Sequence, residues 1–133
     1  MTATKKYIEQ LREFLAKEIK AKPEDIKDNQ IQRILGIASS TMSRYNTEQS
    51  QADDDVAIII AQYIGVPPMQ IIGEIKAEQA RKEETKNWWI EQSKKAVGAF
   101  MGAAILSATL AATPTNSFAS SKMQDSIYYT NFD

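Results

Sequence analysis

The chain contains neither cysteine nor histidine. Without cysteine it can form no disulfide bond and offers no thiolate ligand to a metal. Without histidine it lacks the commonest general base and the commonest metal ligand. The sequence also lacks a paired nucleophile and base, a glycine-rich phosphate loop and a cluster of metal ligands. We therefore expect no enzymatic activity, no cofactor and no metal site.

The chain also has no large excess of positive or negative charge. The net charge is −1, and residues 1–76 carry 10 lysines and arginines against 11 aspartates and glutamates. Proteins that bind nucleic acid usually have a basic surface, so any such surface here must be local. We expect no signal peptide, because residues 1–4 lead into a charged amphipathic helix and not into an apolar segment.

Helical periodicity runs through the first part of the chain, and no β-strand pattern competes with it. Apolar residues recur at helical spacing in residues 4–19, 28–35, 39–45, 53–64 and 66–76. Thr4 is expected to cap the first helix, and the acidic triplet Asp53, Asp54 and Asp55 the fourth. We therefore predict an all-α fold with a five-helix domain over residues 1–76. Its predicted core consists of Phe14, Leu15, Ile31, Leu35, Ile37, Met42, Ile59, Ile60 and Ile72.

Residues 28–47 carry the pattern of two short helices joined by a tight turn. Ile31 and Leu35 lie on the apolar face of the first helix. Gly36 follows, at a position where a helix end favours positive φ, and Ile37 supplies an apolar side chain to the turn. This layout is typical of a helix-turn-helix.

The second helix of this pair is predicted to have two distinct faces. Met42 and Tyr45 fall on one of them. The opposite, polar face consists of Ser39, Ser40, Ser43 and Arg44. Arginine can read guanine bidentately and serine can contact a base or a phosphate, so we predict that these four residues bind DNA. At the start of the first helix, Lys27, Asn29 and Gln30 are expected to contact phosphates.

Towards the C-terminus the sequence first becomes polar and then becomes apolar. Strong helix formers extend the fifth helix to about residue 86, so residues 77–95 are predicted to form a polar helical connector. Residues 96–112 then form a run of 17 residues without charge, close to the ~17–20 residues needed to cross a bilayer core. We predict a transmembrane helix over residues 96–113 and a flexible tail over residues 114–133. The alternative is a buried or self-associating helix in a soluble protein.

The flanks of this apolar segment predict its orientation and its pairing. Trp88 and Trp89 are typical of a membrane interface, and basic residues lie mainly on the N-terminal side, which places the helical domain in the cytoplasm. The expected location is thus the bacterial inner membrane, as a single-pass protein; the alternative is the cytoplasm. Gly98 and Gly102 form a GxxxG pair, and Ala99, Ala103 and Ser107 form a neighbouring row of small residues; either one favours a homodimer in lipid. Residues 118–121 resemble a signal-peptidase site, so an internal cleaved signal is a further alternative.

Two sets of residues resemble known families. The first set comprises Ile31, Gly36, Ile37, Thr41, Met42, Ser43, Tyr45 and the segment DDDVAIIIAQYIGVPPMQIIGEI; the second comprises Ala77-Glu78-Gln79-Ala80 and Trp88-Trp89. Through the first set, residues 28–75 resemble the lambda-repressor/Cro-like helix-turn-helix domains. Through the second, residues 4–112 resemble a family of short proteins of filamentous phages and prophages that has no known function.

Two functions compete on these grounds. The resemblance implies a membrane-anchored transcriptional regulator of phage or prophage origin that binds specific sequences of double-stranded DNA. The alternative is a membrane-anchored phage interaction or assembly protein that uses the helix-turn-helix to bind protein. The Cro-like domains have a small residue where this chain has Gln32. They have a serine or threonine cap where it has Ala38, so that Ser39 is expected to cap one residue late. Both departures favour the alternative, as does the near-neutral charge.

Overall fold

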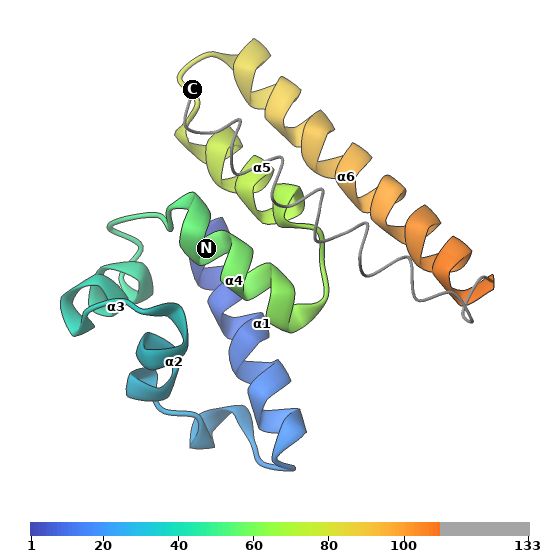
Figure 1. The fold of residues 1–133 in the computed structure, drawn as a ribbon. Coiled ribbons are helices and arrows are strands. Elements are labelled where there is room, and N and C mark those ends of the chain that lie inside the picture. Colours follow the sequence, from blue (N-terminus) through green and yellow to red (C-terminus); the bar gives the residue numbers. More distant parts are fainter. Residues whose placement is uncertain (110–133) are drawn as a thin grey trace. The chain divides into compact units, whose positions relative to one another are not determined.

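All regular structure in the described part of the chain is helical, as the sequence predicts. The computed structural model describes the backbone of residues 1–109 and the side chains of residues 1–101. Its elements, shown in Figure 1, are α1 (Ala3–Glu18), the short 3-10 helix η1 (Pro23–Asp25), α2 (Asp28–Leu35), α3 (Ser39–Asn46), α4 (Asp54–Ile64), α5 (Pro68–Gln79) and α6 (Glu83–Thr109).

The chain divides into two compact units, Met1–Gly98 and Ala99–Asp133. Helix α6 begins in the first unit and continues into the second, which is described only as far as Thr109. Within the described residues, no helix combines the length and the hydropathy required to cross a bilayer. The segment 96–113, predicted to be transmembrane, is helical as far as it is described. Its last residues and the predicted tail over 114–133 lie outside the described residues.

Local sequence signals account for four of the helix ends. Gly36 and Gly65 end α2 and α4 with φ angles of 66° and 76°, in the left-handed region that glycine enters without steric cost. Asp53 caps α4 as predicted, because its carboxylate accepts a hydrogen bond from the Val56 N–H at 3.0 Å. Thr2 caps α1 by accepting from the N–H three residues later.

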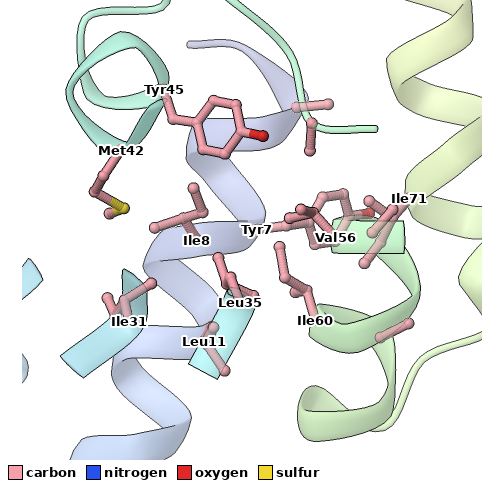
Figure 2. Packing of buried hydrophobic residues seen from close by; sticks show 14 of the residues in the cluster. Tyr7, Ile8, Leu11, Ile31, Leu35, Met42, Tyr45, Val56, Ile60 and Ile71 are labelled. Carbon is pink, nitrogen blue, oxygen red and sulfur yellow. The ribbon is translucent and has the colours of Figure 1, made fainter. Parts of the chain in front are cut away.

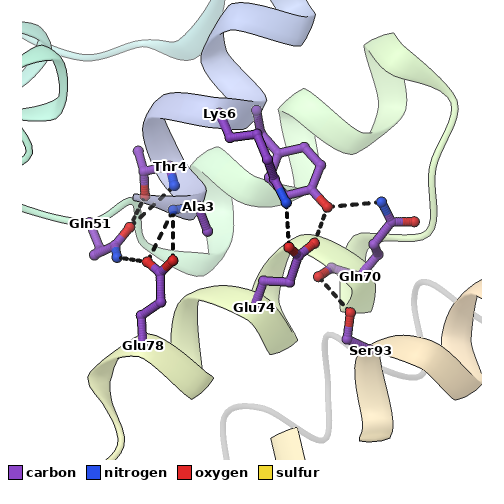
Figure 3. A network of polar contacts seen from close by, with 9 residues as sticks. Ala3, Thr4, Lys6, Gln51, Gln70, Glu74, Glu78 and Ser93 are labelled. Carbon is purple, nitrogen blue, oxygen red and sulfur yellow. Dashed lines mark hydrogen bonds and ion pairs between the residues drawn. The ribbon is translucent and has the colours of Figure 1, made fainter. Parts of the chain in front are cut away.

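The prediction that Thr4 caps α1 is wrong. Thr4 lies inside the first turn and is fully buried, where its hydroxyl contacts the Gln51 side chain and accepts from the Ala52 N–H at 2.9 Å. The Ala3 N–H donates to both carboxylate oxygens of Glu78, each at 3.0 Å (Figure 3). The first turn of α1 is therefore held by the loop that follows α3 and by α5.

The fifth helix is shorter than predicted. It ends at Gln79 and not near residue 86. Ala80 has an extended backbone, with φ −71° and ψ 136°, and a new helix begins at Glu83. The predicted connector over residues 77–95 is therefore the end of one helix and the start of another.

A close contact between α5 and α6 explains this break. A Cβ atom on Gly73 would lie 2.9 Å from the Cβ of Ser93 and 3.0 Å from the carbonyl oxygen of Trp89. Only glycine allows the two backbones to approach so closely. The Ser93 side chain is buried there, and its hydroxyl donates to the Gln70 carbonyl at 3.0 Å. This packing favours a turn at residues where helix propensity alone favours continuation.

The hydrophobic core is centred on α1 (Figure 2). Its most deeply buried apolar side chains include Tyr7, Ile8, Leu11 and Ile71, each at most 1% exposed. Four residues predicted for the core are buried as expected, namely Ile31, Leu35, Met42 and Ile60. The other five lie at its margin and are half-buried, namely Phe14, Leu15, Ile37, Ile59 and Ile72. Helical periodicity thus identified the correct faces but not the depth of each residue.

Candidate nucleic-acid interface

Three residues connect α2 to α3, and each has a separate role. Gly36 ends α2 in the left-handed conformation. Ile37 is half-buried against the hydrophobic core, and its N–H donates to the Gln32 carbonyl at 3.1 Å. Ala38 has an extended backbone and is the N-cap of α3. The connection is therefore short and anchored by one apolar side chain, as the sequence predicts for residues 36–38.

Helix α3 has one buried and one exposed face. Met42 and Tyr45 are 1% and 4% exposed and fix the helix to the core (Figure 2). Burial raises the pKa of Tyr45, as does the nearby charge of Asp53, while Arg44 opposes them. The four residues predicted to bind DNA are all exposed, namely Ser39, Ser40, Ser43 and Arg44. Among the described residues, none forms a hydrogen bond or ion pair with these four side chains. This face is available to a partner.

The predicted cap at the start of α3 is wrong. Ser39 is the first helical residue, and the N-cap is Ala38, which has no side-chain hydrogen bond to offer. An N-cap side chain must come from a residue whose own backbone is not helical, and Ser39 no longer meets that condition. The hydroxyl of Ser39 therefore remains on the exposed face.

The three residues predicted to contact phosphates surround the start of α2. Lys27 is the N-cap residue, and Asn29 and Gln30 lie in the first turn; all three are exposed. The amide oxygen of Gln30 accepts a hydrogen bond from the Lys27 N–H at 2.8 Å. Gln30 thus helps to begin the helix; its contact with a phosphate stays a prediction.

Sequence analysis missed a contact that joins three helices. One carboxylate oxygen of Asp28 in α2 accepts from the Arg12 guanidinium of α1 at 2.8 Å. The other accepts from the Asn46 side-chain amide of α3 at 3.1 Å. Arg12 also donates to the Ile26 carbonyl at 2.5 Å. Asp28 therefore ties the end of α3 to the start of α2, the two neighbouring helices that carry the predicted binding residues.

Positive charge gathers on the same segment. Residues 27–46 contain three cations, Lys27, Arg33 and Arg44, against the single anion Asp28. The Arg12 side chain pairs with that anion at 2.8 Å and also with Glu9 at 3.6 Å. The rest of residues 1–76 carries 7 cations and 10 anions. The local excess of positive charge within residues 1–76 thus lies in the segment that carries the predicted binding residues.

Among the residues that the structure describes, no three aspartate or glutamate side chains come together as a metal site would require. Comparison of the chain with protein-family models, with curated proteins and with solved structures finds no match. The function must therefore be inferred from the arrangement of its own residues.

Proposed function

We propose that α1–α5 form a Cro-like helix-turn-helix domain and that the chain is a sequence-specific, DNA-binding transcriptional regulator of phage or prophage origin. The observation that carries this proposal is the exposed polar face of α3, on a helix whose other face is buried through Met42 and Tyr45. A helix anchored in this way can lie in the major groove with its polar side chains against the bases. The local excess of cations supports the same function, because attraction to phosphates supplies much of the affinity for DNA.

Each residue of this surface has a distinct role in the proposed complex. Arg44 hydrogen-bonds a guanine in the major groove, and the three serines of α3 contact bases or phosphates. Lys27 and Asn29 hold phosphates and so fix the position of the domain on the duplex. The Asp28 contact with α1 and α3 keeps the two helices in the geometry that these contacts need.

The test is selection of bound sequences from a random duplex library, followed by titration at several salt concentrations. Arg44→Ala should weaken specific binding by about 1–3 kcal/mol and relax the preference at one base position. Lys27→Ala should weaken binding to all sequences alike. It should also reduce the slope of the logarithm of the binding constant against the logarithm of the salt concentration by about one. Lys17→Ala, which removes an exposed charge near the end of α1, is the matched control. Binding that selects no sequence and ignores salt would refute the proposal.

The second candidate is a protein-binding module of a phage interaction or assembly protein. Two observations favour it: residues 1–76 carry a net charge of −1, and the N-cap residue of α3, Ala38, makes no side-chain hydrogen bond to the helix. This function predicts no salt-dependent affinity for duplex DNA. Arg44→Ala would then weaken binding of a protein partner, and neither the parent nor the variant would bind duplex DNA in the titration.

We also propose that residues 96–113 anchor the chain in the inner membrane, with the N-terminal domain in the cytoplasm, and that Gly98 and Gly102 pair two copies. Fractionation of the expressed full chain tests the anchor, which is rejected if the protein is freely soluble without detergent. Removing residues 96–133 should give a monomer that binds DNA more weakly but prefers the same sequence. Gly102→Ile should reduce pairing and leave the protein in the membrane fraction.

A further inference from the structure

A groove of about 560 Å³ lies between α1, α5 and the first half of α6, within the unit Met1–Gly98. No residue of α2 or α3 lines it, so it is separate from the candidate nucleic-acid interface. It is a shallow groove that is open to solvent, and not an enclosed cavity. The residues that determine its chemistry are Lys6, Tyr7, Glu74, Ile90, Lys94 and Val97.

One wall of the groove is a chain of hydrogen bonds (Figure 3). The Gln70 amide donates to the Tyr7 hydroxyl at 2.9 Å, and that hydroxyl donates to Glu74. Lys6 binds the other oxygen of the Glu74 carboxylate at 2.5 Å. Burial, and then the bond to Glu74, raise the pKa of Tyr7 well above its usual value, so the hydroxyl remains a donor. Glu74 therefore has both oxygens engaged and its charge balanced.

The opposite wall comes from one face of α6. Ile90, Lys94 and Val97 follow the i, i+4, i+7 spacing of a single helical face, and Ile90 and Val97 are half-buried. Lys94 has no carboxylate partner within the described residues, whereas the adjacent Lys95 pairs with Glu91 at 3.4 Å. This wall therefore offers an apolar strip beside one uncompensated positive charge.

We propose that this groove binds a small amphipathic monoanion, a carboxylate with a short hydrocarbon chain. The carboxylate pairs with Lys94, and the hydrocarbon covers the exposed parts of Ile90 and Val97. The single uncompensated charge of the groove matches a monoanion, because a phosphate dianion would leave a negative charge close to Glu74. Such a ligand would connect α6 to α1 and α5. The proposal goes beyond the DNA-binding function and does not depend on it.

The test is a titration of the isotope-labelled full chain with straight-chain carboxylates, followed by the backbone amide signals in NMR spectra without nucleic acid. Hexanoate should shift the signals of the groove, including Lys6, Gln70 and Ser93. Affinity should rise with chain length from butanoate to octanoate by up to about fourfold for each methylene buried. Hexanol and hexylammonium, which lack the negative charge, should bind more weakly than hexanoate.

Two neighbouring lysines provide matched variants. Lys94→Gln should raise the dissociation constant of hexanoate about two- to fivefold, the range expected for a partly exposed ion pair. Lys95→Gln should leave it unchanged, and Val97→Gln should weaken the dependence on chain length. Melting temperatures within error of the parent show that the variants are folded. Three outcomes would each overturn the proposal. The two lysine variants could change the dissociation constant of hexanoate equally, or hexanol could bind as tightly as hexanoate. The third is that only the signals of Phe100 and Met101 shift, two exposed residues outside the groove.

Discussion

Replacing Gly73 by alanine tests the contact between α5 and α6 directly. The added Cβ would lie 2.9 Å from the Cβ of Ser93 and 3.0 Å from the Trp89 carbonyl oxygen. Carbon atoms in good contact are about 3.5–4.0 Å apart, so α6 must move outwards by roughly 0.6–1.1 Å. Because the Trp89 atom belongs to the backbone, no change of a side-chain rotamer can relieve this contact.

Three contributions determine the size of the effect. Alanine favours the helical state of α5 by about 1 kcal/mol relative to glycine. Overpacking opposes it with a cost of about 1–3 kcal/mol. Displacement of α6 also strains the hydrogen bond from Ser93 to the Gln70 carbonyl, which contributes about 0.5–1.5 kcal/mol. We therefore expect Gly73→Ala to lower the free energy of unfolding by about 0.5–3.5 kcal/mol.

The chain supplies its own control in Gly98, another helical glycine, where an added Cβ would meet nothing within 4 Å. In the unpaired chain, Gly98→Ala should stabilise the helix by up to about 1 kcal/mol, so the same substitution has opposite signs at the two sites; its effect on the pairing proposed for Gly98 is a separate readout. Urea denaturation followed by circular dichroism measures both, and hydrogen exchange should show reduced protection around Ser93 in Gly73→Ala only. If the two variants unfold at the same urea concentration, α6 does not pack on α5 as described.

Three further predictions concern the core, a cap and the response to pH. Leu35→Ala should cost about 2–5 kcal/mol, because Leu35 is 3% exposed; an unchanged urea midpoint would show that α2 is misplaced. Asp53→Ala removes the 3.0 Å bond to the Val56 N–H and should cost about 1 kcal/mol, whereas Asp53→Asn, which can still cap, should retain most of the stability. Because the folded protein raises the pKa of Tyr7 above its ordinary value of 10.0, stability should fall as pH rises above about 10, where the unfolded state loses the proton first. Tyr7→Phe is expected to be less stable than the parent at neutral pH. The difference between the urea midpoints of the two proteins should narrow at alkaline pH; a difference that does not change with pH would contradict the raised pKa of Tyr7.

Features that depend on neighbouring residues could be predicted from the sequence. The turn at Gly36, the helix end at Gly65 and the cap at Asp53 each follow from the conformational preference of one residue. The buried and exposed faces of α3 follow from helical spacing, because Met42 and Tyr45 are three residues apart. The all-α fold and the exposure of the candidate binding residues were predictable for the same reason.

Features that join distant segments could not be predicted. The break after Gln79 depends on the approach of Ser93 to Gly73, which helix propensity does not register. Thr4 has the chemistry of an N-cap, but its hydroxyl is engaged by Gln51 and Ala52, nearly fifty residues later. The contact of Asp28 with α1 and α3 is of the same kind. In each case the deciding partner becomes a neighbour only once the helices have packed.

The bond between Ala3 and Glu78 has a consequence for the order in which the domain can form. Synthesis delivers α1 first, yet the acceptor of its first N–H lies 75 residues later in the chain. The Tyr7 hydroxyl likewise finds Glu74 only 67 residues later. While α5 is still inside the ribosome, the apolar face of α1 lacks the contacts that α5 makes with it. Closing so long a loop delays folding more than it costs stability, so we expect α1 to remain open to chaperones and proteases until α5 emerges, and the domain then to fold in a single step.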